Sequence, residues 1–126
     1  MDYLIIEDDD IDIMITKRMI EIVSPNISPV ALQNGKQAMS YLEHRWQDRS
    51  LPTLKFIILD LIMPIMDGFE FLEMYSKSLY KKFPTVPLII LTNSYDQVDK
   101  IHTQSYPFVS TYTEKPLNKN LLKTFL

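Results

Sequence analysis

The chain has 126 residues, contains no cysteine, and carries 13 basic and 16 acidic side chains, for a formal charge of −3 at pH 7. This length fits one domain over residues 1–126 and leaves no room for a separate effector domain. The absence of cysteine excludes disulfides and thiolate metal sites, and the acidic balance argues against a nucleic-acid surface. No apolar run is long enough to span a membrane and no signal peptide is visible, so we expect a cytoplasmic protein.

Short apolar runs alternate with amphipathic stretches along the chain. We expect strands at residues 2–6, 28–32, 55–59, 86–91 and 108–113. We expect helices at residues 10–23, 35–46, 67–80, 95–105 and 117–125. The amphipathic pattern of the first helix comes from apolar residues at helical spacing, namely Ile11, Ile15, Met19 and Ile22. Successive β–α units of this kind predict a parallel sheet with helices on both faces.

The glycine content narrows the choice among doubly wound α/β folds. The sequence has 2 glycines, and neither lies in a G-x-G-x-x-G loop, so a dinucleotide-binding fold is disfavoured. We therefore expect a flavodoxin-like, doubly wound sheet of five parallel strands in the order 2-1-3-4-5, with five helices. In this order the first and third strands are neighbours at the topological switch point, where ligands bind such sheets.

Carboxylates follow both of these neighbouring strands. Residues 7–10 are all acidic and come directly after the first strand, and Asp60 follows the third. Carboxylates held close together raise one another's pKa unless a cation lies between them, and oxygen ligands favour a hard ion such as Mg²⁺. For Asp10 and Asp12 the simpler explanation is the favourable place of an acid in the first turn of a helix, and Asp9 fits either role. The sequence therefore predicts an oxygen-only metal site at this edge of the sheet.

A longer motif surrounds the second of these acids, and single residues elsewhere complete a pattern. The motif is Leu59-Asp60-Leu61-Ile62-Met63-Pro64-Ile65-Met66-Asp67-Gly68. The other positions, in chain order, are Glu7-Asp8, Thr92, Tyr112 and Lys115-Pro116. In this order and spacing they resemble the receiver domains of two-component response regulators over essentially the whole chain, and among these the stand-alone, chemotaxis-regulator-like type.

The resemblance implies a role for each matching residue. Asp60 would be the phosphoacceptor, a carboxylate nucleophile of the kind that forms aspartyl phosphates. Asp8, Asp60 and the backbone carbonyl of Ile62 would bind Mg²⁺ directly, and Glu7 would do so through water. Glutamate at that position is a variant of the more frequent aspartate. Magnesium keeps several waters of its own and therefore tolerates such a partial protein cage.

The resemblance also implies how phosphorylation would be sensed. The Thr92 hydroxyl would donate to a phosphoryl oxygen, and the Lys115 ammonium would offset the added charge. The family often holds the bond between such a lysine and the following proline cis, here Lys115 and Pro116. Thr92 would move toward the phosphoryl group, and Tyr112 would rotate inward into the space left behind. This threonine–tyrosine pair is the expected switch.

The function implied is that of a phosphorelay switch rather than an enzyme. A histidine kinase or histidine phosphotransfer protein would phosphorylate the chain, which would then signal by binding an unidentified partner protein. Neither nucleic acid nor membrane is an expected partner, and the chain would be a monomer or a phosphorylation-dependent dimer. The surface of the fourth helix, fifth strand and fifth helix, with Tyr95, Tyr106, Tyr112 and Lys119, is the one the family commonly uses for output.

Other functions fit the same residues less well. A receiver-like interaction module could bind a partner without phosphorylation, although every site position is present. A small aspartyl-phosphate hydrolase usually carries a second acid two residues after the nucleophile, where this chain has Ile62. Flavin binding in the same fold would need a Ser/Thr/Gly-rich phosphate loop after the first strand, where this chain has acids that repel the cofactor.

Overall fold

The computed structural model describes residues 1–48, 54–93 and 96–126. Its sheet has five parallel strands, and the order β2-β1-β3-β4-β5 confirms the flavodoxin-like prediction. The strands are β1 (Asp2–Ile6), β2 (Ser28–Leu32), β3 (Leu54–Leu59), β4 (Leu88–Thr92) and β5 (Val109–Glu114). Each lies within two residues of its predicted position.

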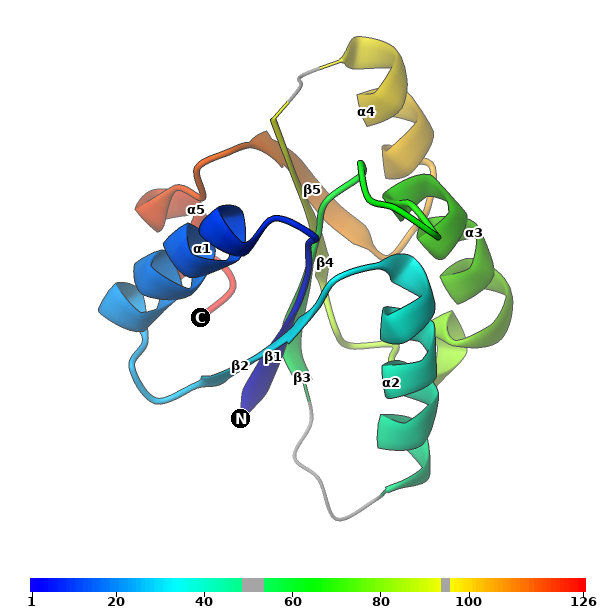
Figure 1. Ribbon diagram of the computed structural model, residues 1–126, viewed down its shortest axis with the longest axis horizontal. Helices are drawn as coiled ribbons and strands as arrows, with labels where there is room; N and C mark the ends of the chain where they lie inside the picture. The colour runs from blue at the N-terminus through cyan, green and yellow to red at the C-terminus, as the bar shows by residue number, and fades with distance from the viewer. Residues whose placement is uncertain (49–53, 94–95) are drawn as a thin grey trace.

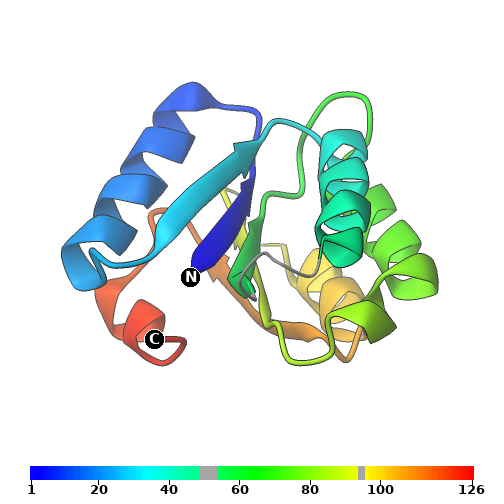
Figure 2. The ribbon, with the colours of Figure 1, turned by 90° about the horizontal axis from the view of Figure 1, so that it is seen from below.

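Five α-helices cover the two faces of this sheet. They are α1 (Asp10–Val23), α2 (Gly35–Gln47), α3 (Gly68–Ser78), α4 (Gln97–Gln104) and α5 (Lys119–Lys123). Helices α1 and α5 lie on one side, and α2 and α3 lie on the other with α4 beside them (Figures 1 and 2). This division follows from right-handed crossovers, because the step from β1 to β2 runs in one direction along the sheet and the later steps, from β2 to β3, β4 and β5, run in the other. No helix among the described residues is both long and apolar enough to cross a membrane.

The helix boundaries follow from side-chain caps. The carboxylate of Asp9 accepts hydrogen bonds from two backbone N–H groups of α1, and the side-chain oxygen of Asn34 accepts one from the N–H of Gln37 in α2. Asp67 and Glu70 form a reciprocal capping box at the start of α3, which therefore begins at Gly68. The prediction of 117–125 for the last helix is too long, because Asn118 caps α5 and starts it at residue 119. The predicted start of the fourth helix, residue 95, lies outside the described residues.

The buried side chains form two apolar clusters, one on each face of the sheet. The larger one lies under α2 and α3 and includes side chains such as Leu42, Phe71 and Tyr75. The smaller one lies under α1 and α5 and includes Ile13, Ile20 and Leu122. Alternate side chains of the central strands enter opposite clusters, as expected for strands buried on both faces.

The face of α1 that packs on the sheet differs from the face that its apolar spacing predicts. Ile13, Thr16 and Ile20 are its buried residues. Ile11, Ile15 and Ile22, three of the four that define the predicted amphipathic pattern, are exposed. The helix itself is confirmed, but it carries two apolar stripes, and only one of them packs on the sheet.

Candidate functional site

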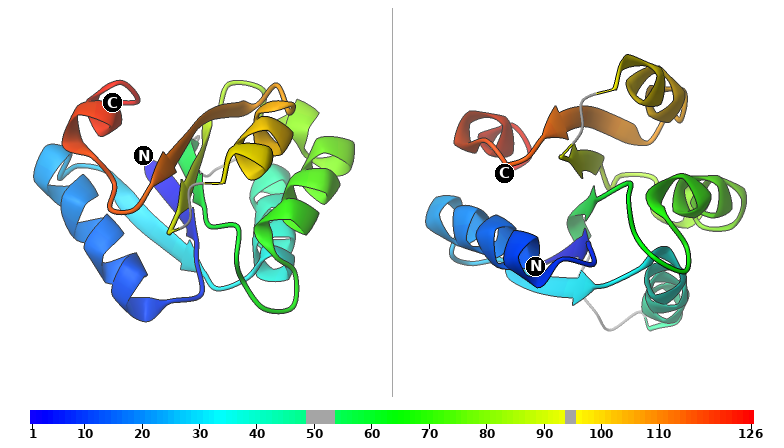
Figure 3. Two further views of the ribbon diagram at one scale, coloured as in Figure 1. Left: turned by 90° about the horizontal axis from the view of Figure 1, so that it is seen from above. Right: turned by 45° about the horizontal axis from the view of Figure 1, so that its top comes forward.

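The register of the sheet brings the predicted site residues to one edge. Ile6 of β1 pairs with Leu59 of β3, so the residues that follow, Glu7 and Asp60, leave the sheet side by side. The backbone N–H of Asp60 donates to the carbonyl of Ile6 at 3.0 Å. On the other side, the N–H of Lys115 donates to the carbonyl of Thr92 at 2.8 Å. This edge comes forward in the right-hand view of Figure 3.

We call the hollow at this edge the acid pocket. It has a volume of about 240 Å³. It is lined by Glu7, Asp8, Asp9, Asp12, Asp60, Ile62, Thr92, Asn93 and Lys115. Glu7, Asp8 and Asp60 each offer a carboxylate oxygen, and these oxygens lie within 4.8 Å of one another. Glu7 and Asp60 are buried, whereas Asp8 is exposed at the mouth. The three acids predicted as metal ligands therefore do converge.

Within the described part of the chain, one ammonium group, that of Lys115, faces these acids. The Nζ of Lys115 donates to Glu7 and, at 2.7 Å, to Asp12. It lies 3.5 Å from an oxygen of Asp60, at the limit of a hydrogen bond. The Lys115 side chain is only 10% exposed, so these contacts are shielded from solvent. The lysine thus divides one positive charge among three carboxylates.

The pKa values of Glu7 and Lys115 are both raised in this pocket. Burial and the neighbouring Asp60 raise the pKa of Glu7 from 4.5 to about 8, although Lys115 acts in the opposite direction. Burial by itself would lower the pKa of Lys115, but hydrogen bonds to Asp12 and Glu7 outweigh it and hold that pKa above its usual range. The rise in pKa at Glu7 thus comes first from burial and then from Asp60, whereas the rise at Lys115 comes from its carboxylate partners.

The loop after Asp60 is closely packed. A Cβ on Gly68 would lie 2.5 Å from the backbone oxygen of Asp60, so only glycine lets the chain return this close to Asp60. The N–H of Gly35 donates to the carbonyl of Met66, which ties this loop to the start of α2. Between these anchors Ile65 adopts a φ of 69°, an uncommon conformation for a β-branched residue. The loop geometry is therefore held by its neighbours and not by local preference.

The remaining predicted residues occupy the expected elements. Thr92 ends β4 and is buried in the pocket wall, and Ile62 is exposed beside Asp60. The peptide bond between Lys115 and Pro116 is cis, as the resemblance implies. Tyr112 on β5 is buried in the larger apolar cluster, so its ring already lies inward here. Tyr95, predicted on the output surface, lies outside the described residues.

One site residue was missed by sequence reasoning. The sequence pattern predicts for Asp12 only a place in the first turn of α1, yet its carboxylate also accepts a hydrogen bond from Lys115, 103 residues away in the chain. The capping role belongs to Asp9, which was left open. The available signal was the position of Asp12 four residues after Asp8, about one helical turn from the strand-end acids.

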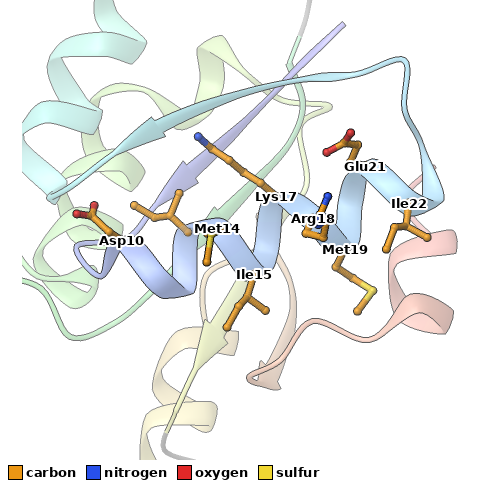
Figure 4. A pocket seen from close by; sticks show the side chains of 9 residues that line it. Asp10, Met14, Ile15, Lys17, Arg18, Met19, Glu21 and Ile22 are labelled. Carbon is orange, nitrogen blue, oxygen red and sulfur yellow. The ribbon is translucent and has the colours of Figure 1, made fainter.

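A second hollow lies on the outer side of α1 and contains none of the metal-site acids. It has a volume of about 710 Å³ and is lined by α1 side chains, including Met14, Ile15 and Ile22 (Figure 4). Asp10 lies at its edge and accepts a hydrogen bond from Gln33 at 3.1 Å. Asp10 and Asp12 therefore belong to the same helical turn but to different surfaces.

Comparison with known proteins identifies the family. A family model described as the response regulator receiver domain matches residues 3–126. The chain belongs to this family. Receiver domains are signalling switches of two-component systems, generally not classed as enzymes, and they bind Mg²⁺ or Mn²⁺ at an acidic cluster. Glu7, Asp8 and Asp60 form such a cluster in this receiver domain.

Two curated relatives cover nearly the whole receiver domain. The probable methanogenesis regulatory protein FilR2 of Methanothrix harundinacea is 32% identical over 95% of this chain and 75% of its own length. Response regulator Rcp1 of Synechocystis is 29% identical over 95% of this chain and 80% of its own length.

Solved structures agree on the fold. A two-component response regulator from Cytophaga hutchinsonii matches with a TM-score of 0.85 at 24% identity, over 98% of this chain and 92% of its own. The Mn²⁺-bound form of Rcp1 matches with a TM-score of 0.75 at 26% identity, over 98% and 88% of the two chains.

Proposed function

We propose that the chain is a single receiver domain over residues 1–126 that accepts a phosphoryl group on Asp60. The donor is a histidine kinase or histidine phosphotransfer protein in the cytoplasm, and the output is the binding of a partner protein, by a monomer or a phosphorylation-dependent dimer. One observation carries this proposal: Asp60 lies buried at a strand end, 3.5 Å from a lysine ammonium and beside two further acids.

The transfer itself needs little covalent machinery from the protein. An oxygen of Asp60 attacks the phosphorus of a phosphohistidine, the N–P bond breaks as the O–P bond forms, and the released imidazole takes up a proton. The protein contributes position and charge. Lys115 is close enough to reach a phosphoryl oxygen on Asp60, and the buried hydroxyl of Thr92 lines the same pocket.

The donor set fits a divalent cation. Glu7, Asp8 and Asp60 offer only oxygen ligands, and their carboxylate oxygens lie within 4.8 Å of one another. Asp8 and Asp60 would bind Mg²⁺ directly together with the carbonyl of Ile62, and Glu7 would do so through water. When bound, the ion would neutralise charge on the transferring phosphoryl group. The Mn²⁺-bound structure of the relative Rcp1 supports this assignment.

The switch is proposed for the pair Thr92 and Tyr112. Both are buried, and they lie on the adjacent strands β4 and β5, where Tyr112 pairs with Ile90. A phosphoryl group that draws Thr92 toward Asp60 would change the packing available to the neighbouring ring. Such coupling requires that phosphorylation bias two packings that differ by a few kcal/mol.

The test is intact mass after incubation with Mg²⁺ and acetyl phosphate or phosphoramidate. We expect one labile phosphoryl group on the parent chain and none on Asp60→Asn. The variant Asp10→Asn, which removes an acid outside the acid pocket, should be modified like the parent. If no donor modifies the parent and it binds no beryllium trifluoride, the phosphoacceptor proposal is wrong and an interaction module independent of phosphorylation becomes the better account.

A further inference from the structure

The proposed function gives no role to two acids of the pocket, Asp9, which caps α1, and Asp12. Asp12 belongs to the first turn of α1, where its backbone N–H is already capped by Asp9 at 3.0 Å. Its carboxylate reaches across to Lys115 of the β5–α5 connection at 2.7 Å. The Asp12 side chain is 25% exposed and that of Lys115 is 10% exposed, so solvent screens this ion pair only in part.

The ammonium of Lys115 lies closer to two of its three acids than to the third. An ammonium has three N–H donors, and those of Lys115 engage Glu7 and Asp12 on the α1 side at hydrogen-bond distance. Asp60, the proposed phosphoacceptor, lies at 3.5 Å from the same nitrogen. Lys115 is therefore held closer to α1 than to the atom where the phosphoryl group would be attached.

We propose that Asp12 is a positioning residue that holds the Lys115 ammonium on the α1 side of the acid pocket and competes for it with a phosphoryl group on Asp60. This inference rests on the proposed function. A phosphoryl group brings negative charge and strong acceptor oxygens, so it attracts Lys115 away from Asp12. The free energy of the Asp12–Lys115 pair then opposes that movement, and the bond between α1 and the β5–α5 connection weakens on phosphorylation.

The competition predicts a gain when Asp12 loses its charge. In Asp12→Asn, Lys115 is released toward Asp60, and we expect beryllium trifluoride with Mg²⁺ to bind about three- to fivefold more tightly. The aspartyl phosphate should last longer by a similar factor. Asp12→Glu keeps the charge and the reach, and its binding should stay within about twofold of the parent.

A matched control separates positioning from simple charge removal. Asp10→Asn removes the same charge from the same helical turn, but Asp10 faces Gln33 and not Lys115. It should change the binding of the analogue by less than about 1.5-fold, because exposed charges are screened by salt. In a Lys115→Met background, Asp12→Asn should have no larger effect than Asp10→Asn, since Asp12 acts through the lysine.

A second readout needs neither metal nor phosphoryl group. Crystal structures of the metal-free parent and of Asp12→Asn should differ in the distance from Lys115 Nζ to the Asp60 carboxylate, which shortens to hydrogen-bond range in the variant. An unchanged lysine position, or unchanged or weaker binding of the analogue in Asp12→Asn, overturns the inference. A parent that binds no analogue and is modified by no phosphodonor overturns the proposed function, and the lysine positions then decide the role of Asp12 alone.

Discussion

The two ends of strand β1 each place an acid beside a buried cation, but the charge balance differs. At the start of the strand, Asp2 pairs with Arg45 of α2 at 3.1 Å, and Arg45 also donates to the hydroxyl of Tyr41. Beyond the other end, Lys115 faces Glu7, Asp12 and Asp60. Among the described residues, the carboxylate of Asp2 pairs with Arg45, whereas three carboxylates face Lys115. We therefore expect the first ion pair to stabilise the fold, whereas the proposed function requires the second region to keep several carboxylates around one lysine.

The largest expected effect comes from breaking the balanced end. Arg45→Met should lower the free energy of unfolding by about 2–3 kcal/mol, because it removes a guanidinium whose side chain is 5% exposed and leaves Asp2 without its partner. Urea unfolding measures this loss. Arg18→Met, the same change at an exposed arginine of α1, should cost less than about 0.5 kcal/mol. Equal losses in the two variants would contradict the structural role of the Arg45 pair.

The unbalanced end should make stability depend on pH. The pKa of Glu7 is raised from 4.5 to about 8, so folding favours its protonated form. In the metal-free protein this stabilisation is complete below pH 4.5 and is lost as the pH rises through about 8. Between low and high pH the free energy of unfolding should therefore fall by about 2 kcal/mol less in Glu7→Gln than in the parent. One pKa unit corresponds to about 1.4 kcal/mol, and the charge is shared with neighbouring groups.

Urea unfolding in EDTA between pH 5 and pH 8.5 measures the pH effect. Glu43→Gln, at an exposed glutamate of α2, is the control and should follow the parent curve. A Glu7→Gln curve with the slope of the parent would show that Glu7 does not carry the effect.

Added Mg²⁺ should raise the free energy of unfolding by binding at the acid pocket and not at the Asp2–Arg45 pair. At ten times its dissociation constant, a ligand that binds the folded state alone adds about 1.4 kcal/mol. We expect this gain in the parent and, because the two sites are far apart and independent, also in Arg45→Met. Asp8→Asn should lose most of it, since Asp8 is a proposed direct ligand. Thermal unfolding with Mg²⁺ and with EDTA checks both expectations, and a gain that survives in Asp8→Asn would refute the ligand assignment.

The smallest expected effect is a substitution that raises the free energy of unfolding and does not lower it. Without metal, Asp60→Asn should raise the free energy of unfolding by about 1 kcal/mol, because it removes repulsion from the acid pocket at the expense of function. Asp2→Asn, the same substitution at the balanced end, should lower it. Urea unfolding in EDTA compares the two. A destabilised Asp60→Asn would mean that Lys115 already compensates the pocket.

Much of the fold was predictable because it depends on local patterns. Apolar runs of strand length, amphipathic stretches between them and the scarcity of glycine led to the correct sheet order. The same topology explains why the proximity of Glu7 and Asp60 could be predicted, since each follows one of two adjacent parallel strands. Caps such as Asn118 shifted the helix ends by a few residues, because a cap is decided by the backbone conformation around it.

The sequence by itself determined the family motif, which is contiguous, and it predicted the strand order and the converging acids, because the succession of β–α units limits the possible topologies. Only the tertiary structure decided which stripe of α1 is buried, because Ile13 and Ile20 compete with Ile11 and Ile15 for the same helical spacing and the sheet selects one pair. It also decided that Asp12 shares Lys115, a contact between residues 103 positions apart. Periodicity reports what a segment can bury, whereas the long-range packing of α1 on the sheet fixes what it does bury.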